Sequence, residues 1–133
     1  MAEESRCRRE NAYPGLFTDS AKAGDLYTKT GTVKIDNKLY PAEVGYILVL
    51  EDPADVHSRL IALPVKRILA DQQPCHEPIF YLGGGPGQSN MGYKPHSDYF
   101  QNHDYVLVGY RGVDGSVVLG SPEIKKGIEG KGQ

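Results

Sequence analysis

Short apolar runs separated by turn-forming residues fill the middle of the chain and predict a β-rich domain. The segments Glu43–Leu50 and Arg59–Leu69 are rich in aliphatic and β-branched residues, and a connection bearing Pro and Asp joins them. Two such runs joined by a short turn are expected to pair antiparallel. Pro64 lies inside the second run. Because proline has no N–H, we expect it at an edge, at a bulge or with its nitrogen turned away from a paired strand.

Two further runs, Ile79–Leu82 and Tyr105–Val108, are apolar throughout. This pattern is typical of strands that are covered on both faces. The intervening residues 83–103 are numerous enough for the crossover that a parallel pair requires. Within them, Ser97–Asn102 has room for a turn or two of helix.

Less regular segments flank these runs. Residues 1–42 are expected to form an N-terminal arm that ends in a small hairpin, because apolar residues of Thr30–Tyr40 surround the turn-forming Asp36-Asn37-Lys38. Residues 43–123 form the predicted domain, and the glycine-rich residues 124–133 are expected to be a frayed tail. The sequence thus predicts an α/β fold class with a mixed sheet and little helix.

Composition and charge restrict the class of protein. The 133 residues are 39% hydrophobic, which suffices for one modest core. The net charge is −2, from 15 Lys and Arg against 17 Asp and Glu, so we expect no nucleic-acid partner. The apolar runs are far too short to span a bilayer, and the first ten residues lack the apolar region of a signal peptide. We therefore expect no membrane partner and a cytoplasmic location.

The cysteines and histidines give no metal-ligand pattern. Cys7 and Cys75 have no such spacing and define no disulfide framework, so we interpret each as a free thiol. Cys75 precedes His76, but neighbouring side chains in an extended segment point to opposite faces, which disfavours a nucleophilic pair. The four histidines form no metal triad. We therefore expect neither a metal nor another cofactor.

The run Gly83–Gly87, with the sequence Gly-Gly-Gly-Pro-Gly, directly follows an apolar segment. Glycine permits positive φ values and close approach of the backbone to a bound atom, so we examined anion binding. A P-loop needs a lysine that is absent after Gly87, and the dinucleotide fingerprint fails at Gln88. Two interpretations stay open, a tight exit from a strand and an oxyanion hole for acyl transfer.

Two sequence blocks resemble the proline iminopeptidase-like and tripeptidyl-aminopeptidase-like serine peptidases, which are α/β-hydrolases. Gly84-Gly85-Pro86-Gly87 is similar to the family's Gly-Gly-Pro-Gly loop, and Arg111–Ser116 is similar to its Arg-Gly-x-Gly-Ser block with one extra residue. The likeness covers about residues 43–123. Two departures stand out, since Gly83 replaces a frequent histidine and Gly109-Tyr110 replaces a frequent Asp-Gln.

The resemblance implies an incomplete α/β-hydrolase-like sheet, in which an antiparallel strand pair is followed by parallel strands. The four strands from residue 43 onwards would lie in the spatial order first, second, fourth, third. Gly84, Gly85 and Gly87 would form the oxyanion-hole loop. In that loop Gly85 and Gly84 would donate backbone N–H groups, and Gly87 would let the chain turn.

No serine lies on the Gly-x-Ser-x-Gly elbow that such an enzyme needs. Ser89 has Met91 at the final glycine position, and Ser116 has Asp114 and Val118 at the two glycine positions. In the resembled family the elbow, the acid and the catalytic histidine all come later in the chain. We therefore expect an N-terminal fragment of a serine peptidase or esterase-like hydrolase that has no catalytic residue of its own and is inactive alone.

A complete enzyme of this kind would hydrolyse a peptide or ester substrate without a cofactor. The alternative is a small non-catalytic binding module that uses a hydrolase-like half-sheet. In either case an exposed strand edge at Ile79–Leu82 would allow contact with another chain, including self-association.

Overall fold

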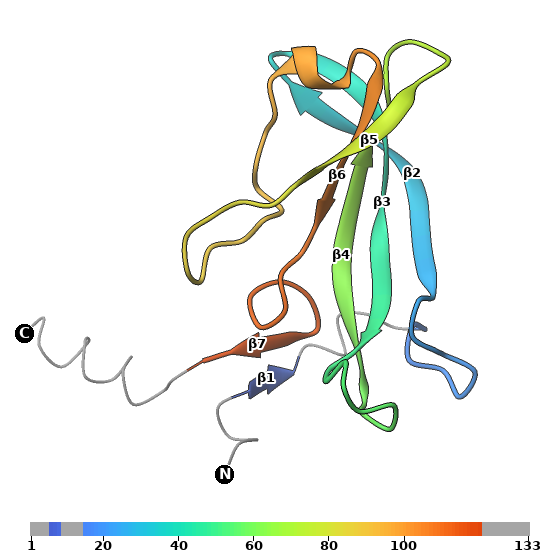
Figure 1. Ribbon diagram of the computed structural model, residues 1–133, viewed down its shortest axis with the longest axis vertical. Coiled ribbons are helices and arrows are strands. Elements are labelled where there is room, and N and C mark those ends of the chain that lie inside the picture. The colour runs from blue at the N-terminus through green and yellow to red at the C-terminus, as the bar shows by residue number, and fades with distance from the viewer. Residues whose placement is uncertain (1–5, 9–14, 121–133) are drawn as a thin grey trace, which may run out of the picture.

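A five-stranded mixed sheet forms the body of the protein in the computed structural model, which describes residues 6–8 and 15–120 (Figure 1). Its strands are β2 (Leu26–Ile35), β3 (Lys38–Leu50), β4 (Leu60–Ile68), β5 (His76–Tyr81) and β6 (His103–Val108). A short 3-10 helix, η2 (Ser97–Phe100), lies at one end of the sheet. At the other end β1 (Arg6–Arg8) and β7 (Val117–Leu119) form a separate antiparallel pair. The expected frayed tail, residues 124–133, lies outside the described residues.

The predicted strand pairing is confirmed. β3 pairs antiparallel with β4, and β5 pairs parallel with β6. The sheet order is β2-β3-β4-β6-β5, so the four strands from β3 onwards lie in the predicted order first, second, fourth, third. The predicted helical turn at Ser97–Asn102 is present as η2. A mixed sheet with little helix is therefore the observed architecture.

The N-terminal hairpin is much longer than predicted. β2 pairs with β3 along its whole length, so the hairpin is part of the main sheet. Asp36 and Asn37 have φ values of 50° and 64°, as the two central residues of a type I′ turn require. β3 runs without a break across residues 42 and 43. The predicted boundary between the N-terminal arm and the domain at this point is therefore wrong. Strand β1 also lies within the segment that was expected to be an arm.

Pro64 fits inside β4 because pairing with β6 begins one residue later. It lies opposite Tyr46 of β3, and the first residue of β4 that pairs with β6 is Val65. Its carbonyl accepts a hydrogen bond of 2.8 Å from the Gly109 amide, so its nitrogen faces the same side, beyond the paired region. The Pro64 nitrogen is therefore turned away from β3, and the missing N–H removes no bond from the ladder between β3 and β4. A nitrogen turned away from a paired strand is one of the three predicted placements.

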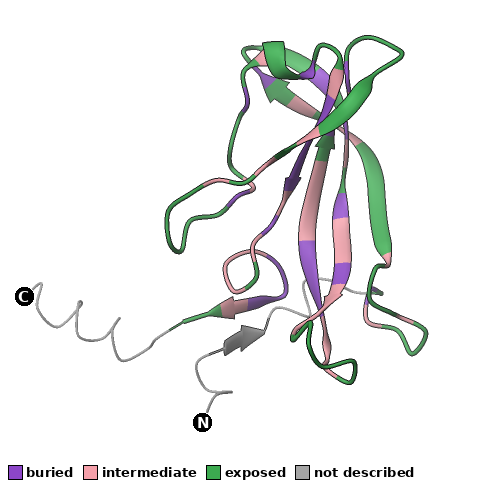
Figure 2. Cartoon of the chain, viewed as in Figure 1, coloured by how far each residue is buried: buried purple, intermediate pink, exposed green. Residues whose placement is uncertain are grey.

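Apolar side chains pack against both faces of the sheet. The largest buried cluster comprises Ile35, Tyr40, Ile68, Phe100, Tyr105 and Leu107. Phe100 of η2 is fully buried there and meets Tyr40 edge-on, with 4.5 Å between ring centroids. On the opposite face Ile61 and Leu63 pack against Val117 of β7, because successive residues of β4 point to opposite faces. Figure 2 shows that the two outer strands, β2 and β5, are largely exposed.

A buried carboxylate links β6 to β4. One oxygen of Asp104 accepts hydrogen bonds from Arg67 Nε and Nη2 at 2.8 and 2.5 Å, and the other accepts from the Ala70 amide at 2.8 Å. Burial alone would raise the pKa of Asp104, but the Ala70 amide and the Arg67 guanidinium together lower that pKa below its ordinary value. The ionised form of Asp104 therefore stabilises the fold.

We expect Asp104→Asn to lower the free energy of unfolding by about 1–3 kcal/mol at neutral pH, because the Arg67 charge pair is lost. The folded-state pKa of Asp104 is lowered, so its contribution is present above the unfolded pKa of about 3.9. That contribution is lost as pH falls through the folded pKa. Urea unfolding should therefore show the gap between wild type and variant narrowing at acidic pH.

Glu43→Gln is the matched control for this experiment. Glu43 lies 3.4 Å from the same Arg67, but both side chains of this pair are well exposed. An exposed pair contributes at most about 1 kcal/mol, so the control should unfold close to wild type. A gap for Asp104→Asn that stays constant from neutral to acidic pH would show that the charge on Asp104 does not stabilise the fold.

Candidate functional site

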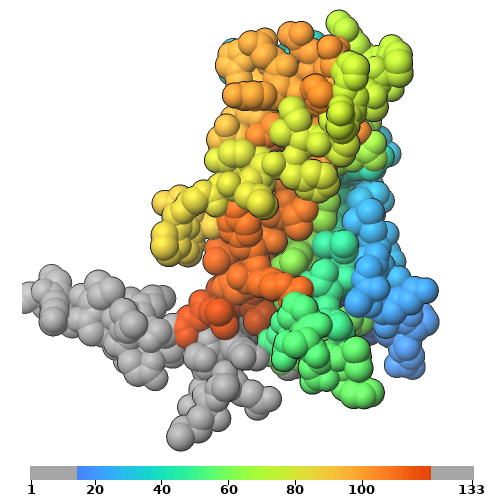
Figure 3. Space-filling view, in the orientation of Figure 1, coloured from blue at the N-terminus to red at the C-terminus, as the bar shows by residue number. Residues whose placement is uncertain are grey.

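The glycine-rich loop leaves the sheet at the carboxyl end of β5 and projects from the side of the molecule (Figures 1 and 3). Gly85 and Gly87 have φ values of 103° and 76°, which glycine adopts without a steric penalty. The Gly85 carbonyl accepts a hydrogen bond of 3.2 Å from the Gln88 amide. Pro86 and Gly87 are thus the central residues of a β-turn, where a type II turn favours this pair.

Asn90 fastens this loop to the sheet. Its side chain is almost fully buried, and its Oδ1 accepts a hydrogen bond of 3.0 Å from the Gly83 amide. Its Nδ2 donates to the carbonyls of Tyr81 and Val108, each at 3.0 Å. These two carbonyls lie at the carboxyl ends of β5 and β6. One side-chain amide therefore joins two parallel strands at the point where the loop begins.

Asp114 brings the second sequence block against the glycine loop. Its Oδ1 accepts a hydrogen bond of 2.5 Å from the Ser89 hydroxyl. Its Oδ2 accepts from the amides of Asn90 and Tyr110, at 3.2 and 2.8 Å. The Tyr110 hydroxyl in turn donates to the Gly83 carbonyl at 2.7 Å. The two blocks on which the family resemblance rests are therefore in direct contact.

A pocket of about 220 Å³ lies beside the loop. It is lined by Tyr81, Gly83, Gly84, Gln88, Ser89, Asn90, Tyr93 and Tyr110. Tyr93 stacks on Tyr81, with 3.7 Å between ring centroids and an angle of 8°. Within residues 15–120, the amides of Gly84 and Gly85 donate to no other protein atom. Adjacent backbone amides without a protein acceptor are suited to binding an anion.

The three predicted loop glycines have different positions in this site. Gly84 lines the pocket, whereas Gly87 takes the positive φ that the turn needs and Gly85, the first residue of the turn, also has a positive φ. Gly85 also approaches Gln88 so closely that a Cβ would lie 2.8 Å from that side chain. Ser89 lies in the pocket, but its hydroxyl donates to a carboxylate and no histidine lines the pocket. The arrangement lacks the histidine that serves as the base in a Ser-His-Asp triad.

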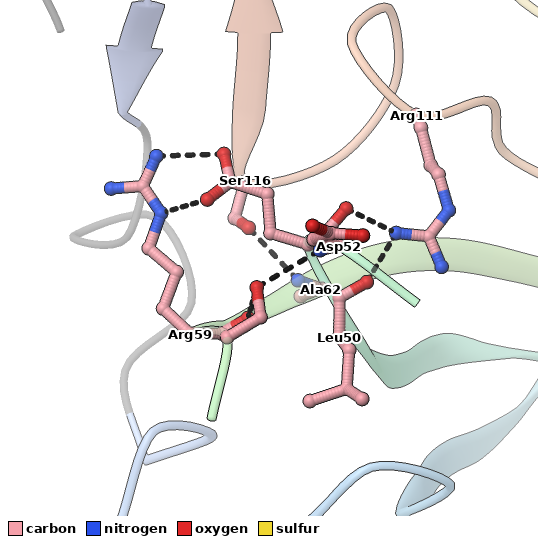
Figure 4. Close-up of polar contacts among 8 residues, drawn as sticks. Leu50, Asp52, Arg59, Ala62, Arg111 and Ser116 are labelled. Carbon is pink, nitrogen blue, oxygen red and sulfur yellow. Dashed lines mark hydrogen bonds and ion pairs between the residues drawn. The ribbon is translucent and has the colours of Figure 1, made fainter. Parts of the chain in front are cut away.

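Ser116, the serine of the second block, has a structural position. Its hydroxyl accepts a hydrogen bond of 2.8 Å from the Ala62 amide, while its own amide donates to the Ala62 carbonyl at 3.0 Å (Figure 4). Arg111 reaches the carbonyls of Leu50 and Glu51, just where β3 ends. These contacts fasten the second block to the β3–β4 hairpin and so fix the support of the glycine loop.

Asn90, Asp114 and Tyr110 were not identified from the sequence as site residues. Asn90 gives no sequence signal, because its partners are backbone atoms of two distant strands. The extra residue in the second block indicated a local difference from the family pattern, and the lengthened spacing between its glycines contains Asp114. Tyr110 marked a departure from the family pattern, and its hydroxyl contacts the loop.

The remaining candidate residues lie away from this pocket. Cys75 is exposed and has no disulfide partner in the described chain. Cys7 belongs to β1, whose side chains lie outside the description. Within residues 6–8 and 15–120 no three His, Cys, Asp or Glu side chains are grouped as metal ligands. The same part of the chain contains no helix of the length and apolar character needed to cross a membrane.

Comparison with known proteins gives no assignment for this chain. No family model, no curated protein and no solved structure matches it. The contacts of the glycine loop are therefore the basis for its chemistry.

Proposed function

We propose that the chain is the N-terminal part of a serine peptidase or esterase-like α/β-hydrolase, and that the glycine loop supplies half of its oxyanion hole. The observation that carries the proposal concerns the amides of Gly84 and Gly85, which lie beside a pocket at the carboxyl end of a parallel strand and have no protein acceptor within residues 15–120. In α/β-hydrolases the loop after the third strand gives one N–H to the oxyanion, and the residue after the nucleophile gives the other.

The loop would act on the charge that develops during acyl transfer to water. As a nucleophile attacks a peptide or ester carbonyl, negative charge moves onto the carbonyl oxygen, and a fixed N–H stabilises it. One such donor contributes about 3–4 kcal/mol to transition-state stabilisation. Asn90 fixes the Gly83 amide beforehand, so the loop needs little rearrangement when substrate binds. The chemistry uses no cofactor.

The free edge of β5 supports the same proposal. β5 is the outer strand of the sheet, and the exposed fractions of Phe80 and Leu82 are 62% and 74%. In the resembled family the strand that bears the nucleophile would pair at this edge. The serine, the acid and the histidine of the reaction would all come from that later sequence.

We expect the 133-residue chain to give no stoichiometric labelling with a serine-directed fluorophosphonate. No histidine lines the pocket beside Ser89, and Ser116 is buried with its hydroxyl bound to the Ala62 amide. Intact-mass spectrometry after incubation measures the result, with an active serine peptidase as the positive control. Labelling of one serine per chain would show that this chain carries its own nucleophile.

The DNA downstream of the coding sequence distinguishes the hydrolase from the non-catalytic module. A continuation that encodes Gly-x-Ser-x-Gly, in frame or after a frameshift, is the expected result. A well-sequenced locus without such a continuation would favour the module.

The exposed β5 edge also favours contact with another chain, and we infer self-association through it. An unpaired flat edge with apolar side chains can template pairing, and Phe80 and Leu82 have this character. We expect the mass from light scattering to rise with protein concentration, and Phe80→Lys to suppress the rise. Val56→Lys is the control, because Val56 is even more exposed than Phe80 but lies in the β3–β4 connection.

A strict monomer at every concentration would contradict self-association. If that monomer also melted sharply above about 65 °C, the upper end of the usual range for mesophilic domains, the sheet would be complete without a partner. That combination would favour the stand-alone binding module.

A further inference from the structure

Asp114 lies within the segment by which the second block exceeds the family pattern in length. This segment folds so that the carboxylate faces the loop, where it accepts hydrogen bonds from the Ser89 hydroxyl and the amides of Asn90 and Tyr110. Two residues before this block the chain has Gly109, where the family frequently has Asp. A Cβ at Gly109 would lie 2.6 Å from the ring of Pro64 and 2.7 Å from the Cβ of Asp114. Pro64 and Asp114 together thus occupy the space that a side chain at position 109 would need.

The contacts of Asp114 lead to the Gly84 amide in two steps. Asp114 holds the backbone of Tyr110, and the Tyr110 hydroxyl holds the Gly83 carbonyl. That carbonyl and the Gly84 N–H belong to one peptide unit, which is planar and normally trans. In a trans unit the C=O and N–H point in opposite directions. Fixing the Gly83 carbonyl therefore fixes the direction of the Gly84 N–H.

We propose that Asp114 is a positioning residue that orients the Gly84 amide for an oxyanion through Tyr110. This inference rests on the proposed function. Three donors surround the carboxylate of Asp114, and their dipoles offset part of its negative charge. Asp114 is also not among the residues that line the pocket, so its side chain supports the loop from outside the pocket.

The test measures binding of methylphosphonate, a tetrahedral oxyanion, by the shifts of the Gly84 and Gly85 amide resonances in ¹H–¹⁵N spectra. We expect Asp114→Ala and Tyr110→Phe each to weaken binding about tenfold. This is the loss expected when the Gly84 N–H, no longer held in direction, forfeits its charge-assisted hydrogen bond to the anion. Tyr110→Phe removes only the hydroxyl, so it remains informative if Asp114→Ala does not fold. Asp55→Ala is the control, because it also removes a carboxylate, but Asp55 accepts its hydrogen bond from the His57 amide in the exposed β3–β4 connection and does not contact the loop.

Unchanged affinity in both loop-side variants, or an equal loss in Asp55→Ala, would overturn the positioning role. If wild type does not bind methylphosphonate, the proposed function fails, and hydrogen exchange of the Gly84 amide then tests positioning separately. Faster exchange in Asp114→Ala and Tyr110→Phe but not in Asp55→Ala would support it. Equal exchange in all three variants would overturn it.

Discussion

Asn90→Ala should lower the free energy of unfolding by about 3 kcal/mol, because it removes the partners of three backbone groups at once. The Gly83 amide and the carbonyls of Tyr81 and Val108 all bond to this one side chain. A buried polar group that loses its partner costs about 1–3 kcal/mol, and water that enters the pocket would offset part of the sum. Urea unfolding at neutral pH measures the effect.

Gln88→Ala is the matched control, since Gln88 lies in the same loop with an exposed side chain. It should unfold within about 0.5 kcal/mol of wild type, as is usual for surface substitutions. The Gly83 amide should also exchange with solvent faster in Asn90→Ala than in the control. A loss below about 1 kcal/mol for Asn90→Ala, within the net value of a single hydrogen bond, would show that Asn90 does not anchor the loop.

Gly115→Ala should lower the free energy of unfolding at least as much as Asn90→Ala. We expect a loss of about 3–5 kcal/mol, because backbone strain and overpacking act together. Gly115 has a φ of 92°, and a Cβ there would lie 2.1 Å from the Ala62 carbonyl oxygen. That oxygen cannot move aside easily, because both the carbonyl and the amide of Ala62 are bonded to Ser116. Native stability is only about 5–15 kcal/mol, so this variant is expected to be marginally folded.

Gly92→Ala is the control for this substitution. No heavy atom lies within 4 Å of the position of its Cβ, and its φ is outside the left-handed region. Unfolding of this variant should differ from wild type by at most about 0.5 kcal/mol. Similar midpoints for Gly115→Ala and Gly92→Ala would contradict the close packing of the second block on β4.

The strand pairing was predictable because the apolar runs and the lengths of their connections restrict it, whereas the spatial order of the strands was expected only from the family resemblance. A short turn restricts Glu43–Leu50 and Arg59–Leu69 to antiparallel pairing, and the long connection after Ile79–Leu82 permits a parallel neighbour. A turn at Asp36-Asn37-Lys38 was predictable from its residue types, and in the structure Asp36 and Asn37 take the two positive φ values of a type I′ turn.

The length of β2 was not predictable from its residues. Most of its side chains are exposed, so the strand lacks the apolar alternation by which a half-buried strand is recognised. Its position depends on β3, which continues beyond the expected boundary and gives β2 a partner along its whole length. The strand pair β1 and β7 likewise depends on contact between distant parts of the chain.

The candidate site was predictable in its glycines but not in its supports. Consecutive glycines after a strand are a local signal, whereas the support comes from single side chains that act across long separations. Asn90 and Val108 are 18 residues apart, and Ser89 and Asp114 are 25 apart. Only the folded sheet brings these pairs together, at the carboxyl ends of β5 and β6.

Titration of the wild-type chain with methylphosphonate in ¹H–¹⁵N spectra tests whether the glycine loop binds an oxyanion. We expect saturable shifts of the Gly84 and Gly85 amide resonances and little change at Gly92. Gly92 does not line the pocket, and its surroundings are open. Choline chloride at the same ionic strength should leave all three resonances in place. Absence of saturable shifts at Gly84 and Gly85, or equal shifts with choline chloride, would contradict oxyanion binding by this loop.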